Sequence, residues 1–454
     1  MQSETLQNGR QSWLQPGAAV IYAVLGRGWQ TVAGLVTLLV ISHFFSPLTQ
    51  GYYYTFASLL ALQVFVELGL GVVIINTASH EWARLNLDAA GSIKGDERSK
   101  ARLVSLGRFM FRWYAAAAIV FVVVGGSIGY VFLSASSPES LEWQWPWIAA
   151  VIAVGAMLCV MPFVSLLEGC NQVRAVHQFR LWQAVATSLV LWAVIAAGGG
   201  LWASAATPFV GLICILYFLL VRYRNFFRAF WADSPPGRMH WRTEIWPMQW
   251  RLAAQGLVNY FQYSLFTPVI LYYWGGEAAG RVGMTWQAVS ALQMVALSWI
   301  QVGVPRFGAL IAHGKYDELD REWRHAVVVS TAFALVASLA LLFLVYVLNA
   351  LGSGLSQRIL DMPATSLFVA GLVFAHLCQC QAAYLRAHRR EVLTGVAMVT
   401  ALTMGIAVWW LGREFGGVGV AASYCGVMVL VAFPSMSFVW ARARRKWRDE
   451  ARVP

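Results

Sequence analysis

The feature that most constrains this chain is a series of apolar stretches, each about as long as a membrane-crossing helix. A helix needs about 20 predominantly apolar residues to cross the hydrocarbon core of a bilayer. The stretches are continuous rather than alternating, which favours helices over a β-barrel. We predict twelve transmembrane helices, called spans one to twelve, with approximate cores at 20–45, 52–77, 113–133, 146–167, 181–199, 202–221, 252–274, 283–304, 326–349, 364–384, 393–411 and 417–440.

The composition supports a membrane protein. Charged residues make up 12% of the chain and hydrophobic residues 59%, whereas a soluble domain is about a quarter charged. The 14% of aromatic residues argues against disorder. The six cysteines show no zinc or disulfide spacing, and the polar N-terminus shows no cleaved signal peptide. We expect an all-α polytopic membrane protein without a metal or other cofactor.

The distribution of cations predicts the orientation of the chain. Under a twelve-span alternation, 29 of the 33 Lys and Arg residues fall on one side, only Arg281, Arg358 and Arg413 fall on the other, and Arg27 lies within a span. Cytoplasmic loops carry the excess of positive charge, so we expect both termini to be cytoplasmic. The net charge of +12 then reflects topology and anionic lipid rather than nucleic-acid binding.

An internal repeat suggests two six-helix bundles. Thr55–Gln63 in span two and Thr285–Gln293 in span eight share Thr, an aromatic residue, Ala, Leu and Gln at the same spacing, 230 residues apart. Six spans per half give parallel repeats, related by a pseudo-twofold axis along the membrane normal. We predict an N-terminal bundle (1–222), a basic cytoplasmic linker (223–250), and a C-terminal bundle with a basic tail (251–454).

Polar residues inside four spans form the candidate site. Such residues are costly in a bilayer and usually face a cavity, so we expect a central hydrophilic cavity between the bundles. The predicted lining comes from spans one, two, seven and eight: Arg27, Gln30, Gln63, Glu67, Arg251, Gln255, Asn259, Gln262, Gln287 and Gln301.

Two interpretations of Arg27 and Glu67 stay open. Both residues lie at a similar depth on neighbouring antiparallel spans, so they can form a structural ion pair, with Arg27 reaching towards the interface. Alternatively, Arg27 faces the cavity and binds an anion, while Glu67 tunes it or exchanges a proton. Arg251 is either a second anion ligand or a cationic anchor at the cytoplasmic interface.

The sequence argues against an enzyme. Gly198–Gly200 lacks the Lys and Ser/Thr of a nucleotide-binding P-loop, so we predict that the chain is not an ATPase. No soluble stretch is long enough to form a catalytic domain. The predicted outer loops are short and hold few carboxylates, unlike those of a membrane glycosyltransferase or ligase.

Several motifs resemble those of Wzx-type polysaccharide flippases. A Gly51-Tyr52 turn joins spans one and two, and an acidic-Leu-Gly-Leu element follows at 67–70. In the second half, 304–307 (Val-Pro-Arg-Phe) and 312–316 (Ala-His-Gly-Lys-Tyr) resemble that family's link between spans eight and nine. The family belongs to the multidrug/oligosaccharidyl-lipid/polysaccharide exporter (MOP) superfamily, and the resemblance covers nearly the whole chain.

This resemblance implies a function. The expected activity moves a polyprenyl-diphosphate-linked oligosaccharide from the cytoplasmic to the outer leaflet of a bacterial inner membrane by alternating access, for lipopolysaccharide or exopolysaccharide export. Arg27 and Arg251 would bind the diphosphate, because Arg binds phosphate bidentately. Glu67 would couple an ion or pair with Arg27. Polysaccharide polymerases and glycosyltransferases would be partners, and nucleic acid would not.

Two alternatives remain at this stage. A multidrug/cation antiporter of the same fold should have an acidic cavity, yet Glu67 is the only carboxylate well inside a span. A non-transporting scaffold of a polysaccharide assembly complex should lose its polar cavity residues, and here they are present. The sequence favours the flippase over both.

Overall fold

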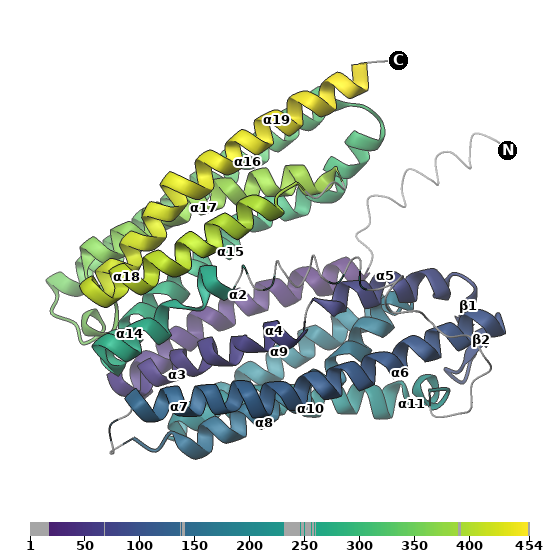
Figure 1. Ribbon diagram of the computed structural model, residues 1–454, viewed down its shortest axis with the longest axis horizontal. Helices are drawn as coiled ribbons and strands as arrows, with labels where there is room; N and C mark the ends of the chain where they lie inside the picture. Colours follow the sequence, from purple (N-terminus) through teal and green to yellow (C-terminus); the bar gives the residue numbers. More distant parts are fainter. Residues whose placement is uncertain are drawn as a thin grey trace. The chain divides into compact units, whose positions relative to one another are not determined.

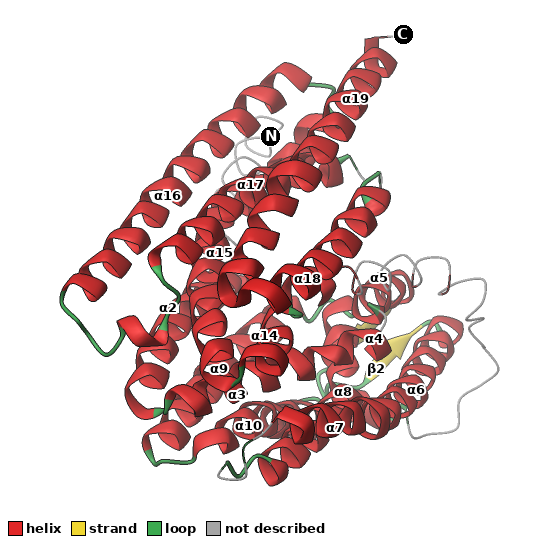
Figure 2. Cartoon of the chain, turned by 60° about the vertical axis from the view of Figure 1, so that its left-hand side comes forward, coloured by secondary structure: helices red, strands yellow, loops and turns green. Residues whose placement is uncertain are grey.

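The computed structural model describes residues 18–67, 69–136, 138, 141–230, 246, 249, 256, 258, 260–388 and 392–452. In this part of the chain, nine helical segments are long and apolar enough to cross a membrane, and a tenth is a broken pair. The single two-stranded sheet seen among these residues is a small hairpin (Figure 2). The prediction of an all-α multi-pass membrane protein is confirmed.

The difference between nine segments and twelve predicted spans has identifiable causes. The segment 394–448 is counted as one but contains the last two predicted spans. Gly416 (φ 60°, ψ −137°) interrupts the helix between them. Span two is the broken pair. Span seven is described only in part, and its C-terminal portion is α14 (Phe266–Trp274). The count of twelve is therefore approximate.

The chain forms two compact units by its internal contacts. The first comprises the described residues within 1–37, 66–127 and 144–250. It holds most of α2 (Ala18–Phe44), α5 (Leu70–Trp82), α6 (Glu97–Val120), α8 (Gln144–Gly169), α9 (Val173–Ala196), α10 (Ala203–Tyr217) and α11 (Arg224–Arg228), with a 3-10 turn (Gly200–Trp202) and π-helical segments at Phe121–Gly125 and Phe218–Arg222. In this unit, α8 packs against α5, α6 and α10.

Glycine makes the contact between α5 and α8 close. A Cβ atom on Gly169 would lie 2.7 Å from the Ile75 carbonyl oxygen, so only glycine fits there without a shift. Small residues at such crossings let the backbones of membrane helices approach each other.

A polar hairpin precedes α6 in the same unit (Figure 1). Strands β1 (Leu85–Leu87) and β2 (Ile93–Gly95) pair antiparallel, with Leu85 opposite Gly95. Asp96 then caps α6, because its carboxylate accepts a hydrogen bond from the Ser99 amide at 2.8 Å. This bond lowers the pKa of the Asp96 carboxyl below its ordinary value.

The second unit comprises 38–65, 128–143 and the described residues within 251–454. It holds the end of α2, α3 (Pro47–Leu60), a 3-10 turn (Ala61–Gln63) and most of α7 (Gly126–Ser136). Its later helices are α14, α15 (Gly276–Ala312), α16 (Tyr316–Ala350), α17 (Met362–Ala387), α18 (Thr394–Val427) and α19 (Phe433–Arg452), with a 3-10 turn at Ser356–Arg358 and a π-helical segment at Met428–Ala432. Helix α15 packs against α3, α16 and α17.

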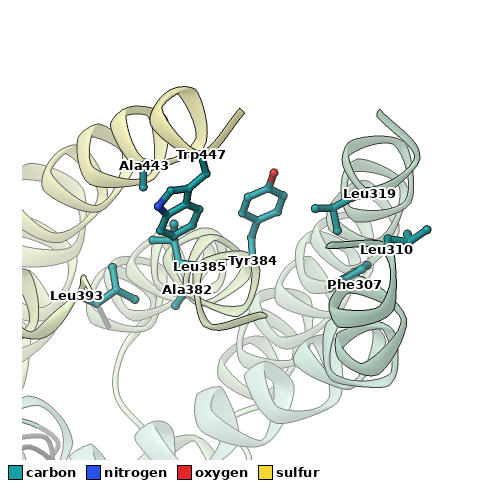
Figure 3. Packing of buried hydrophobic residues seen from close by; sticks show 9 residues of the cluster. All are labelled: Phe307, Leu310, Leu319, Ala382, Tyr384, Leu385, Leu393, Ala443 and Trp447. Atoms are coloured by element: carbon teal, nitrogen blue, oxygen red, sulfur yellow. The ribbon is translucent and has the colours of Figure 1, made fainter. Parts of the chain in front are cut away.

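A buried cluster fixes α19 in the second unit. Ala443 and Trp447 of α19 lie over Leu385 and Tyr384 of α17 (Figure 3). The ring of Trp447 also stacks on His388 at 4.3 Å. Burial of these apolar faces stabilises the contact.

The carboxylate of Asp320, at the start of α16, forms ion pairs with two arginines of α19. Asp320 accepts hydrogen bonds from the Tyr384 hydroxyl at 3.0 Å and from Arg444 and Arg448. Its side chain is only 7% exposed. We call Asp320, Tyr384, Arg444 and Arg448 the Asp320 cluster. A buried charge must be paired and hydrogen-bonded, which explains why the side chains of Arg444 and Arg448 of α19 point towards Asp320.

Candidate functional site

The predicted polar face of span one lies on α2 and divides into two parts. Arg27 and Gln30 are exposed. Thr37, farther along the same face, is buried and accepts a hydrogen bond from Trp192 Nε1 at 2.9 Å. Thr37 therefore serves packing between α2 and α9, whereas the side chains of Arg27 and Gln30 lie at the surface of the first unit.

Arg27 lies in a charged neighbourhood of the first unit. It is close enough to His177 of α9 to interact with it electrostatically. His177 also interacts electrostatically with Glu168 and Arg180. Those two residues form an ion pair at 2.7 Å. Arg27 therefore approaches a group of charges from α8 and α9 that the sequence analysis did not connect with it.

Span two is discontinuous at its acidic residue. Helix α4 (Val64–Glu67) ends at Glu67, Gly69 adopts a left-handed conformation (φ 65°), and α5 begins at Leu70. Glycine accepts this conformation without a Cβ penalty. Glu67 is half-buried and interacts electrostatically with the buried Tyr114 of α6. Discontinuous membrane helices often carry the binding groups of transporters.

This break was not predicted from the sequence. Residues 52–77 are predicted as one continuous span, although Gly69 lies in the acidic-Leu-Gly-Leu element and Gly71 directly follows it. Hydropathy does not register a change of one φ angle, so the apolar run looked uninterrupted. The glycine pair beside a carboxylate was the available signal.

Gln63 occupies the 3-10 turn (Ala61–Gln63) of the second unit. Its Oε1 atom is buried and has no hydrogen-bond partner among the described residues. Two residues later, Phe65 packs against span seven, with its ring centre 5.1 Å from that of Tyr260 and 6.2 Å from that of Phe261. A buried oxygen without a partner costs free energy, so replacing this amide by an apolar group is a test of its role.

The other predicted lining residues of the second unit differ in exposure. Gln262 and Gln287 are half-buried and Gln301 is exposed. The rings of Tyr263 and Trp286 stack at 5.9 Å, which brings the segments of Gln262 and Gln287 together. Arg251, Gln255 and Asn259 lie outside the described residues, so their roles stay predictions.

A polar contact between the two repeat-related helices was not predicted. The buried Gln50 of α3 donates hydrogen bonds to the carbonyls of Gly280 and Arg358, at 2.9 and 3.1 Å. Arg358 in turn donates to the Phe45 carbonyl. Partial burial lowers the pKa of the Arg358 guanidinium below its ordinary value.

Glycine makes this crossing of α3 and α15 possible. A Cβ atom on Gly51 would lie 1.8 Å from the Gly276 carbonyl oxygen, and one on Gly280 would lie 3.0 Å from the Pro47 carbonyl oxygen. Gly276 and Gly280 have the four-residue spacing of close helix pairs in membranes. The four-residue spacing of Gly276 and Gly280 is visible in the sequence, and the internal repeat already relates span eight to span two. Together these two features could have predicted the crossing of α3 and α15.

Comparison with solved structures identifies the architecture. The chain is similar to the lipid II flippase MurJ in an inward closed conformation (TM-score 0.64, 12% identity, covering 95% of this chain and 90% of that one). It is also similar to an inward-facing multidrug resistance MATE family transporter of the MOP superfamily (TM-score 0.62, 13% identity, 94% and 99% covered). The fold is that of the MOP-superfamily transporters.

A third solved structure is also similar to the chain. It is a MOP-superfamily transporter from Pyrococcus furiosus, described as having a binding pocket of reverse polarity (TM-score 0.58, 15% identity, 95% of each chain covered). No family model and no curated protein matches the chain. The identities are low, so the comparisons establish the MOP fold and leave the Wzx resemblance as a prediction.

Proposed function

We propose that this protein is a transporter that flips a polyprenyl-diphosphate-linked oligosaccharide from the cytoplasmic to the outer leaflet by alternating access. The observation that carries the proposal is Arg27, an exposed guanidinium on a membrane-length helix of a MOP fold. Support comes from the likeness of nearly the whole chain to a lipid II flippase. The proposed setting is a bacterial inner membrane, with both termini cytoplasmic and with polymerases and glycosyltransferases as partners.

The chemistry of the cargo assigns the roles of the residues. Arg27 binds the diphosphate through bidentate hydrogen bonds, which suit the planar guanidinium. Arg251 supplies a second cation. Gln30, Gln63, Gln255, Asn259, Gln262, Gln287 and Gln301 hydrogen-bond sugar hydroxyls, and the polyprenyl tail stays in lipid.

Glu67 has two roles within this proposal. Its carboxylate lies at the break in span two, beside the left-handed Gly69. A proton or cation bound there would change the charge at the break and so favour one conformation of the helix pair. Alternatively, Glu67 only pairs with Arg27 and holds its guanidinium in place.

A multidrug/cation antiporter is the second candidate, since MATE transporters share the fold. An exposed arginine repels cationic drugs, which is why we prefer an anionic lipid-linked cargo. A non-transporting scaffold is the third candidate. A scaffold does not require an exposed arginine or a buried Gln63 oxygen without a described partner, so the presence of both argues against this candidate.

Reconstitution distinguishes the three candidates. Liposomes carry the purified protein and an undecaprenyl-diphosphate-linked oligosaccharide that ends in galactose, and a membrane-impermeant β-galactosidase is added outside. Flipping exposes inner-leaflet molecules, so cleavage should go to completion with the protein and stop at the outer leaflet without it. Arg27→Ala protein of equal stability should behave like empty liposomes.

Parallel measurements cover the alternatives. Ethidium movement driven by a proton gradient, without flipping, would replace the flippase with an antiporter. If neither cargo moves in protein that is correctly folded, transport of both tested classes is excluded and the scaffold becomes the better assignment.

A further inference from the structure

We infer that the first unit carries a binding groove for an anionic phospholipid between α6, α8 and α10. The groove has a cavity volume of about 450 Å³, within the range of about 300–1,000 Å³ typical of small-molecule pockets. It is independent of the proposed transport residues, because Arg27 and Glu67 do not line it. The inference therefore stands or falls separately from the flippase proposal.

The walls of the groove are apolar and largely aromatic. Phe163 of α8 lies between Phe111 of α6 and Phe227 of α11, with ring centres at 6.3 and 5.4 Å. Leu216 and Leu220 also line the groove. Phe111 and Leu220 are 47% and 62% exposed, so the groove opens outward, where an acyl chain can enter from the bilayer.

Two cations line the groove beside this apolar surface. Arg108 and Arg112 lie four residues apart on α6, hence on one face of the helix. Arg108 Nε donates to the Phe230 carbonyl at 3.0 Å, which orients the guanidinium. No carboxylate is among the described residues that line the groove.

Phe230 shapes the groove through a glycine. Its ring lies where a Cβ atom on Gly107 would be, only 2.2 Å from Cε1. Gly107 therefore lets Phe230 sit directly against α6, one residue before Arg108. The same residue thus builds the apolar wall and holds the cation, which joins the two parts of the groove in one unit.

This combination matches one ligand class. An acyl chain fits the aromatic and leucine walls, and a headgroup phosphate fits two guanidinium groups. Basic pockets between membrane helices on the cytoplasmic side bind anionic phospholipid headgroups, and the positive-inside pattern predicts that this end of α6 is cytoplasmic. We therefore assign the groove to an anionic phospholipid rather than to a zwitterionic one.

Photo-crosslinking in nanodiscs tests the assignment. The probes are phosphatidylglycerol and phosphatidylcholine, each with a diazirine in one acyl chain, and labelled peptides are mapped after digestion. We expect phosphatidylglycerol to label the segments around Phe111, Phe163 and Leu220 in preference to phosphatidylcholine. Replacing Arg108 and Arg112 by Gln should lower this preference about fivefold for each arginine.

Matched variants separate charge from packing. Arg224→Gln with Arg228→Gln removes two exposed cations of α11 that do not line the groove, and it should leave the preference unchanged. Leu216→Trp fills the groove and should reduce labelling by both lipids, whereas Leu189→Trp, on the exposed side of α9, should not. Arg112→Gln alone, at an exposed position, serves if the double variant fails to fold.

Three outcomes would overturn the assignment. Equal labelling by the two lipids would mean that the groove only contacts bulk lipid. An unchanged preference in folded Arg112→Gln protein would remove the cation from the site. Displacement of phosphatidylglycerol by a much smaller mole fraction of undecaprenyl phosphate would make a polyprenyl lipid the occupant.

Discussion

Two polar regions of the molecule contain the same kinds of side chain in opposite circumstances. In the second unit, the Asp320 cluster and the α3–α15 crossing bury polar groups and satisfy them with partners from distant helices. In the first unit, Arg27 and Gln30 of α2 are exposed. The difference teaches that the role of a polar residue in this protein follows from the groups that surround it. Satisfied groups stabilise the fold, while exposed or partnerless ones are candidates for binding.

The largest expected effect on the free energy of unfolding is at Asp320. Asp320→Asn leaves Arg444 and Arg448 without their shared carboxylate, and we expect a loss of about 3 kcal/mol, as for other broken buried pairs. Asp317→Asn is the matched control: Asp317 also pairs with Arg448, at 3.1 Å, but its side chain is fully exposed. The control should lose less than about 0.5 kcal/mol. If thermal unfolding shows equal losses of stability for Asp320→Asn and Asp317→Asn, burial of the carboxylate does not set its contribution.

The next effect is at the α3–α15 crossing. Gly51→Ala forces a Cβ atom onto the Gly276 carbonyl, and overpacking of this kind costs about 2 kcal/mol. Gly308→Ala, in α15 with open space around it, should cost nothing measurable. Thermal unfolding of the two purified variants provides the check, and unchanged stability of Gly51→Ala would show that the crossing is loose.

Gln63 should respond with the opposite sign. Gln63→Leu removes a buried oxygen without a partner among the described residues, so we expect a gain of about 1 kcal/mol together with slower flipping. Gln50→Leu, in the same span, removes a satisfied amide and should destabilise instead. If Gln63→Leu destabilises as much as Gln50→Leu, then Gln63 has a structural role.

Arg27 should have the smallest effect on stability and a large one on transport. Arg27→Ala should change stability by less than about 0.5 kcal/mol, as for an exposed position, and abolish flipping. Arg27→Lys should keep part of the activity, because a point charge still attracts phosphate without the bidentate fork. Proteoliposome flipping and thermal unfolding are measured on the same preparations.

A double variant decides between the two interpretations of Arg27. If Arg27 binds cargo, Arg27→Ala/Glu67→Ala should stay inactive. Recovery of flipping in the double variant would mean that the damage came from an uncompensated Glu67 charge, and it would leave a structural ion pair in place of a binding residue.

The sequence allowed the fold class to be predicted well and the site only in part. Length and hydropathy indicated the helical spans, because lipid leaves a backbone few other ways to satisfy its hydrogen bonds. The same signals could not find the break at Gly69, which changes a dihedral angle and not the hydropathy. Nor could they show that Thr37 packs on Trp192 while Arg27, ten residues earlier on the same face, is exposed.

The sequence by itself determined that this chain forms apolar helices and that four of the predicted spans carry polar groups, since both follow from the local pattern of residues. Only the tertiary structure decided which of those groups are satisfied. Gln50 donates a hydrogen bond to the Gly280 carbonyl, 230 residues away in the sequence. Asp320 forms ion pairs with Arg444 and Arg448 of α19. Periodicity fixes a direction around one helix, whereas a hydrogen-bond partner depends on which distant helix packs there.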